Sequence, residues 1–93
     1  MGSTRKGREI DAALRSKGFY CDVTGDHVYY FLAGTRIKTK MSHGMMGHSL
    51  STALIALMSR QLHITKKQFL ELIDCTLNEE GYREILDKDN EGD

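Results

Sequence analysis

Apolar residues recur first at helical spacing and then at strand spacing along this chain of 93 residues. In residues 6–17, Ile10 and Leu14 lie four positions apart with Ala13 beside them, which places all three on one face of a helix. Gly18 follows this segment and is a typical residue for a helix end. The pattern therefore predicts an amphipathic helix over residues 6–17.

Three segments with strand character come next, at residues 19–23, 27–32 and 36–41. The first and third alternate apolar with polar side chains, as half-buried strands do, and the second is apolar and aromatic after its first residue. The links are too short for crossover connections, which predicts an antiparallel meander. Gly25 and Asp26, in the first link, favour a tight turn because glycine accepts positive φ and aspartate bonds its own backbone.

Helical spacing returns after a glycine-rich loop at residues 42–48. Ser49 is the expected N-cap of a helix over residues 50–61, because a serine oxygen can accept from a free N–H of the first turn. This helix should bury one apolar stripe, which consists of Leu50, Leu54, Leu57, Met58 and Leu62, with Ile55 at its margin.

Two further helices are expected toward the C-terminus. Thr65 and Gln68 have the spacing of a capping box, which predicts a helix over residues 66–74. A weaker helical pattern covers residues 79–86, where the apolar positions are Tyr82, Ile85 and Leu86. Those side chains need a surface to cover, so this segment should pack on the domain or on a second copy of it in a homodimer.

The order of elements is α-β-β-β-α, followed by a C-terminal helical extension. Strands grouped between helices indicate an α+β fold, with a three-stranded antiparallel sheet packed by helices on one face. We take residues 6–74 as one domain and residues 75–93 as an acidic, partly helical extension. Which face of the second strand the helices cover stays open, because Tyr29 and Phe31 on one face could be core or could stack bases.

Composition places the chain among ordinary soluble globular proteins, since 40% of its residues are hydrophobic and 28% are charged. Its apolar runs are shorter than the roughly 20 residues that span a membrane. Without a signal peptide we expect a cytoplasmic location, where Cys21 and Cys75 are free thiols. The spacing of cysteines and histidines matches no common zinc finger, so we expect neither a metal nor another cofactor.

The formal net charge is zero, but its distribution along the chain is uneven. Residues 79–93 carry a net charge of −5, and residues 1–78 carry the balancing +5. A basic body suggests an anionic partner such as RNA, although a simply solvated acidic terminus explains the same distribution. The acidic segment could also shade the basic strand face within the same molecule.

His27 is the first candidate for chemistry, because it opens the second strand directly after the glycine turn. A strand start holds a side chain firmly, and an imidazole there can titrate near neutral pH and act as a general base or acid. A histidine that merely packs at a hairpin edge is the alternative.

Several short segments, taken in order, resemble HicA-type toxins of bacterial and archaeal toxin–antitoxin systems. The resemblance covers residues 6–74. Its segments are Gly7-Arg8-Glu9-Ile10, Lys17-Gly18-Phe19, Gly25-Asp26-His27 with the aromatic strand behind it, Ser42-His43-Gly44, the helix over residues 49–61, and residues 64–73.

The resemblance implies a double-stranded-RNA-binding-like α-β-β-β-α domain and a metal-independent endoribonuclease, an mRNA interferase, with one essential strand histidine. His27 stands at that catalytic position. The resemblance also implies a HicB-like antitoxin as the protein partner, and no association with a membrane. Asp26 replaces the small polar residue that is usual in the family, and it could orient His27 or repel phosphate.

Metal-free RNA cleavage needs a base for the 2′-hydroxyl proton, positive charge at the phosphate and an acid for the leaving oxygen. His27 would be the base, and His43 could be the acid if its loop folds back over the strand edge. The remaining candidates bind RNA through charge or stacking, and they are Arg36, Lys38, Lys40 and Tyr29.

Other roles remain open for the same residues. The three cations could equally form a solvated strand face, and the chain could be a non-catalytic RNA- or protein-binding module of the same fold. His63, in the link between two helices, should pack rather than bind.

Overall fold

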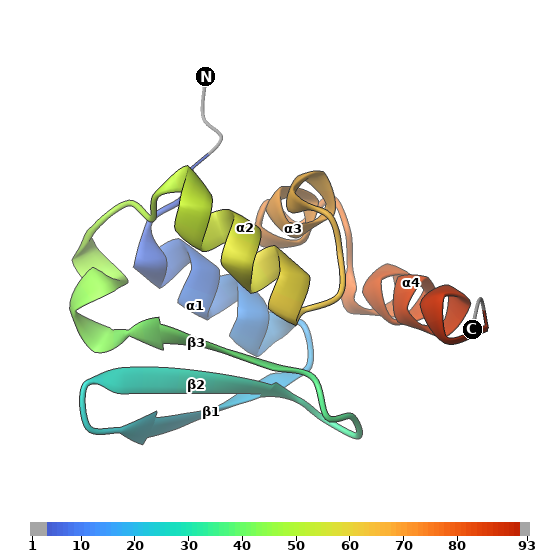
Figure 1. Ribbon diagram of the computed structural model, residues 1–93, viewed down its shortest axis with the longest axis horizontal. Coiled ribbons are helices and arrows are strands. Elements are labelled where there is room, and N and C mark those ends of the chain that lie inside the picture. The colour runs from blue at the N-terminus through green and yellow to red at the C-terminus, as the bar shows by residue number, and fades with distance from the viewer. Residues whose placement is uncertain (1–3, 92–93) are drawn as a thin grey trace.

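A three-stranded antiparallel meander forms one layer of the computed structural model, which describes residues 4–91 (Figure 1). The strands β1 (Phe19–Thr24), β2 (His27–Leu32) and β3 (Lys38–Ser42) lie in sequence order, with β2 in the middle. Gly25 has a φ of +60° in the first turn, where Thr24 pairs with His27. The α+β class and the antiparallel sheet predicted from the sequence are confirmed.

The helices α1 (Gly7–Ser16) and α2 (Thr52–Gln61) pack on one face of the sheet (Figure 1). The N-cap of α2 is Ser51, whose side chain accepts a hydrogen bond from the backbone N–H of Leu54 at 3.2 Å. The prediction of Ser49 as the N-cap is therefore wrong. Ser49 instead forms an isolated β-bridge with Lys6, which holds the chain extended until Ser51.

The helix α3 (Lys66–Ile73) packs against α1 and α2. Its predicted capping box is confirmed, since Thr65 Oγ1 accepts from the Gln68 N–H at 3.0 Å and Gln68 Oε1 accepts from the Thr65 N–H at 2.9 Å. Lys17 is buried at the end of α1 and donates its ammonium to the Leu72 carbonyl at 3.0 Å. This bond ties the last turn of α1 to the last turn of α3.

The two faces of the sheet differ in what covers them. Val28, Tyr30 and Leu32 of β2 are at most 1% exposed, so the helices cover the face that these side chains occupy. The opposite face, here called the open face, consists of Tyr20, Asp22 and Thr24 of β1, His27, Tyr29 and Phe31 of β2, and Lys38, Lys40 and Ser42 of β3.

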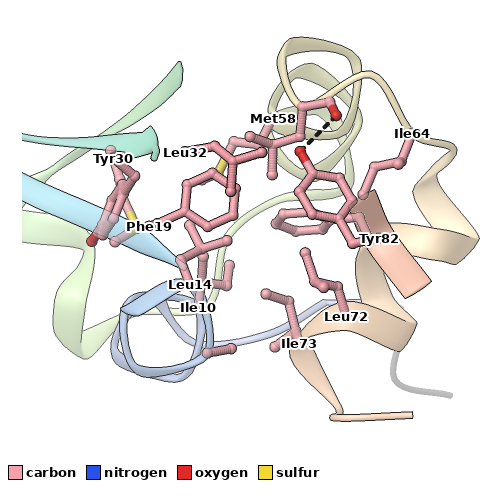
Figure 2. Close-up of a cluster of buried hydrophobic side chains, with 14 of the residues drawn as sticks. Ile10, Leu14, Phe19, Tyr30, Leu32, Met58, Ile64, Leu72, Ile73 and Tyr82 are labelled. Carbon is pink, nitrogen blue, oxygen red and sulfur yellow. Dashed lines mark hydrogen bonds between the residues drawn. The ribbon is translucent and has the colours of Figure 1, made fainter. Parts of the chain in front are cut away.

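The acidic extension is helical in α4 (Glu79–Glu91), which is longer than the predicted 79–86. Tyr82 is fully buried, stacks on Phe19 with ring centroids 5.9 Å apart, and donates its hydroxyl to the Leu62 carbonyl at 2.9 Å. Figure 2 shows the two rings meeting inside the core cluster. The extension therefore packs on this domain, as predicted.

The helix α4 lies beyond the end of the sheet that carries the β2–β3 turn (Figure 1). Arg83 reaches the carbonyl of Ala33 in that turn at 3.2 Å. Lys38 and Lys40 remain exposed on the open face. Asp87 of α4 lines one hollow with Arg36. The expectation that the acidic segment shades the basic strand face stays a prediction.

A short 3₁₀ helix, η1 (His43–Gly47), occupies part of the predicted glycine-rich loop. The start of α1 packs directly on it, because a Cβ at Gly7 would collide with the Met45 carbonyl. The Gly7 N–H also donates to the His48 carbonyl at 2.9 Å. These contacts fix the segment that follows β3.

Candidate functional site

The open face is a small grid, because each of its β2 side chains has one neighbour on β1 and one on β3. The strand register therefore arranges the nine side chains in three rows across the sheet, since cross-strand partners share a face. The rows are Tyr20–Phe31–Lys38, Asp22–Tyr29–Lys40 and Thr24–His27–Ser42.

Four rings form a continuous aromatic series on this grid. Tyr20 and Phe31 stack with centroids 5.3 Å apart, Phe31 and Tyr29 are 6.4 Å apart, and Tyr29 and His27 are 6.3 Å apart. The Lys40 ammonium lies 6.0 Å from the centroid of the Tyr29 ring. Exposed rings beside cations are the combination that stacks bases and binds phosphates of unpaired RNA.

The candidate acid–base residues gather at one end of the sheet. His27 pairs with Ser42, and the backbone N–H of the next residue, His43, donates to the Asp26 carbonyl at 2.7 Å. This bond places the backbone of His43 beside Asp26, one position past the pair of His27 and Ser42. His27 is half-buried, whereas Asp26 and His43 are exposed.

Within residues 4–91, the side chains of Asp26, His27 and His43 form no hydrogen bond and no ion pair. Asp26 thus does not orient the His27 imidazole by a hydrogen bond, although it is the adjacent residue. A ligand at this end of the sheet would meet three side chains whose polar atoms are available to it.

Arg36 lines a hollow of about 360 Å³ together with the other predicted RNA-binding residues, which are Tyr29, Lys38 and Lys40. It lies in the β2–β3 turn, because β3 begins at Lys38 and not at the predicted residue 36. It also lines a second hollow, of about 530 Å³, together with His63 and Arg83.

His63 is exposed in this second hollow, so the prediction that it packs is wrong. Its φ of +64° places it in the left-handed region at the end of α2. The N–H of Ile64 donates to the Ser59 carbonyl and that of His63 to the Arg60 carbonyl, which is the bond pair of a Schellman motif. Such a position turns the side chain outward and leaves packing to the next residue, Ile64.

A cleft of about 200 Å³ lies between α2 and β3, beside His27. Buried Met41, Leu50 and Met58 line it, as do the exposed side chains of Leu54 and Leu57. The polar groups that line the α2–β3 cleft are His27, Lys40, Ser42 and Gln61.

The predicted apolar stripe of α2 is partly wrong. Leu54 and Leu57 are 39% and 46% exposed, whereas Ile55, placed at the margin, is fully buried. The helix is apolar over more than one face, so spacing alone could not choose the face that meets the sheet. That surplus of apolar residues was the signal that could have revealed an exposed apolar surface.

Other features of the described residues bear on the site only indirectly. Among residues 4–88, whose side chains the structure describes, no three His, Cys, Asp or Glu side chains gather as a metal ion would require. None of the described helices is long and apolar enough to cross a membrane. Cys21 and Cys75 are free thiols, and burial raises the pKa of Cys21.

Two contributors to the site were missed from sequence. Tyr20 joins the aromatic series because β1 places it opposite Phe31. Gln61 enters the α2–β3 cleft from the last turn of α2. Neither residue belongs to a sequence motif. Tyr20 reaches the site because β1 pairs with β2, and Gln61 reaches it because α2 packs beside β3.

Comparisons of the chain with protein-family models, with curated proteins and with solved structures gave no match. The resemblance to HicA-type toxins therefore rests on the sequence segments alone, and it stays a prediction.

Proposed function

We propose that this chain is a HicA-like endoribonuclease that binds RNA on the open face and cleaves it with His27. The observation that supports the proposal most is the position of His27. It ends the aromatic series, it lines the α2–β3 cleft, and its imidazole has no hydrogen bond within residues 4–91. A structural histidine is normally held by a partner or packed in the core, and His27 is neither.

In the proposed reaction the RNA supplies its own nucleophile. The His27 imidazole accepts the proton of a 2′-hydroxyl, and the 2′-oxygen attacks the adjacent phosphorus. The bond between phosphorus and the 5′-oxygen breaks, which leaves a 2′,3′-cyclic phosphate and a 5′-hydroxyl. The proton for the leaving 5′-oxygen would come from His43, whose backbone lies beside Asp26 at the same end of the sheet.

Lys40 and Lys38 would bind the RNA phosphates. Both are exposed on the open face, in the rows of Tyr29 and Phe31. The ammonium of Lys40 also lies near enough to the cleft to offset the charge that develops on the attacked phosphate. Arg36 would extend this phosphate-binding surface, because it lines one hollow with Tyr29, Lys38 and Lys40.

We further propose the partners and place that this activity requires. A HicB-like antitoxin would neutralise the toxin by covering the open face, and mRNA as substrate places the protein in the cytoplasm. A homodimer is compatible with both proposals, because the outer edges of β1 and β3 have no strand partner within residues 4–91.

The deciding experiment compares the wild-type protein with His27→Ala on labelled RNA in the presence of a chelator. Loss of a general base should slow cleavage by about 10²- to 10⁴-fold. His48→Ala is the matched control, because His48 is exposed and lies outside the open face. Its cleavage rate should equal that of the wild type, and both variants should unfold at the wild-type temperature.

The runner-up function is a non-catalytic RNA-binding module, and the aromatic series beside Lys40 favours it, because stacking and charge bind RNA without a base. Under that alternative the wild-type protein would bind RNA and release it uncut. Its expression without an antitoxin would then not arrest growth, and His27→Ala would make no difference to growth.

A further inference from the structure

The α2–β3 cleft is not needed for the proposed proton transfers, yet it adjoins His27. Two leucines of its wall, Leu54 and Leu57, are among the large apolar side chains that the fold leaves exposed. Exposed apolar side chains clustered at a cleft with a polar rim are typical of a binding site.

The size and wall of the cleft suit one flat ring. Its volume of about 200 Å³ is below the roughly 300–1,000 Å³ of sites for drug-sized ligands. Met41 and Met58 contribute thioethers to the wall, and such sulfur atoms make favourable contacts with aromatic rings. Lys40 and His27 stand at the rim, where they would attract the phosphate of a nucleotide.

Gln61 gives the cleft a defined polar group. The hydroxyl of Thr39, which is 2% exposed, donates to Gln61 Oε1 at 2.6 Å. The oxygen of the amide is thus engaged, and its NH₂ group has no partner within residues 4–91. Toward a ligand, Gln61 therefore offers donors.

We propose that the α2–β3 cleft holds the base of the nucleotide whose 2′-hydroxyl His27 deprotonates, and that Gln61 selects keto bases. Guanine and uracil present a keto oxygen at the edge where adenine and cytosine present an amino group. The Gln61 NH₂ can donate to the former and opposes the latter. The assignment of this base rests on the proposed function, since the cleft and His27 serve one nucleotide.

The test uses hexamers of deoxyuridine and of deoxycytidine, which lack the 2′-hydroxyl and cannot be cleaved by this reaction. The wild-type protein should bind the uracil hexamer about 5- to 150-fold more tightly than the cytosine hexamer. In NMR spectra, the uracil hexamer should shift the methyl signals of Leu54, Leu57 and Met58. Equal affinities, or methyl signals that do not move, would overturn the proposal.

The substitution Gln61→Glu tests the N–H donors of this side chain, because it removes them and keeps the side chain's length. A carboxylate still accepts the Thr39 hydroxyl but has no N–H, and it can accept from the amino group of cytosine, so the preference should reverse. Gln68→Glu is the matched control, since a glutamate also completes the capping box at Thr65, and it should keep the uracil preference. An unchanged preference in Gln61→Glu would remove the role of Gln61.

The cleavage assay keeps this proposal separate from the proposed function. If the protein prefers uracil hexamers but cuts no RNA, the base pocket is supported and the nuclease function is refuted. If the protein cuts RNA with no preference for the base before the cut, the nuclease function is supported and the base pocket is refuted.

Discussion

Val28, Tyr30 and Leu32 on the covered face of β2 are almost fully buried, whereas His27, Tyr29 and Phe31 on the open face are half-buried. The neighbouring tyrosines show the difference most directly. The Tyr30 hydroxyl donates to Asp11 Oδ1 at 2.6 Å in the interior, and the Tyr29 ring lies beside the Lys40 ammonium on the surface. One residue type thus serves the fold on one face and is available to a ligand on the other.

The two faces also differ in what explains their aromatic side chains. Aromatic side chains on the covered face are explained by the core that they fill. The half-buried rings of β2 on the open face lie outside that core cluster, so the core does not account for them. A series of rings with two lysines beside it is instead the kind of surface that the proposed RNA binding would use.

The largest expected difference between the faces is in stability. Tyr30→Ala should lower the free energy of unfolding by about 3–5 kcal/mol, because it leaves a cavity and removes the Asp11 bond. Tyr29→Ala, the same change one position away, should cost about 1 kcal/mol or less. Urea denaturation of both variants measures the two values, and similar losses would break the distinction between the faces.

RNA affinity should depend on the open face and not on the covered face, which is the reverse of the expected effect on stability. Tyr29→Ala should weaken binding of a short unpaired RNA by about 1–3 kcal/mol, the range for losing one stacked base. Tyr30→Phe alters only the buried hydroxyl and should bind RNA as the wild type does. Fluorescence titration with an end-labelled RNA decides it. An unchanged affinity in Tyr29→Ala would take the open face out of RNA binding.

The smallest effect is expected in the pH dependence of stability. Burial, with the Asp11 carboxylate as a further cause, raises the pKa of Tyr30 in the folded protein. The unfolded chain loses this proton above about pH 10, while the folded state keeps it. Stability from this group is therefore complete below pH 10 and falls by about 1.4 kcal/mol per pH unit above it.

Tyr30→Phe should remove that alkaline slope for one group. A shallower slope should remain, because burial also raises the pKa of Tyr82. Denaturation at a series of pH values from 8 to 11 measures both slopes. Equal slopes in the variant and the wild type would show that Tyr30 ionises as readily in the folded protein as in the unfolded chain.

Much of the fold could be predicted from local patterns. The meander followed from alternation and short links, and the α3 start from the spacing of Thr65 and Gln68. The α2 start was missed because Ser49 and Ser51 are both good N-caps, and only the bridge from Ser49 to Lys6 decides between them. A pattern read from about ten consecutive residues cannot include such a long-range contact.

The candidate site was less predictable than the fold. Sequence placed His27 at a strand start, but both faces of β2 are apolar or aromatic, so its exposure depended on where the helices pack. To predict the α2–β3 cleft, one must know which side of α2 faces the sheet. The sequence leaves this ambiguous, because α2 has apolar residues on more than one side. Exposure of a site is a property of packing, and packing joins segments that are distant in sequence.

The contact between Phe19 and Tyr82 also sets an order in time. The open face lies wholly within residues 20–42, and its local contacts can form early, since they close short loops. A small sheet needs a packed face to persist, however, and part of that packing comes from Tyr82, which lies far along the chain from Phe19. The open face therefore reaches its full stability only after α4 has docked, so a contact made late in folding completes a surface whose own strands pair early.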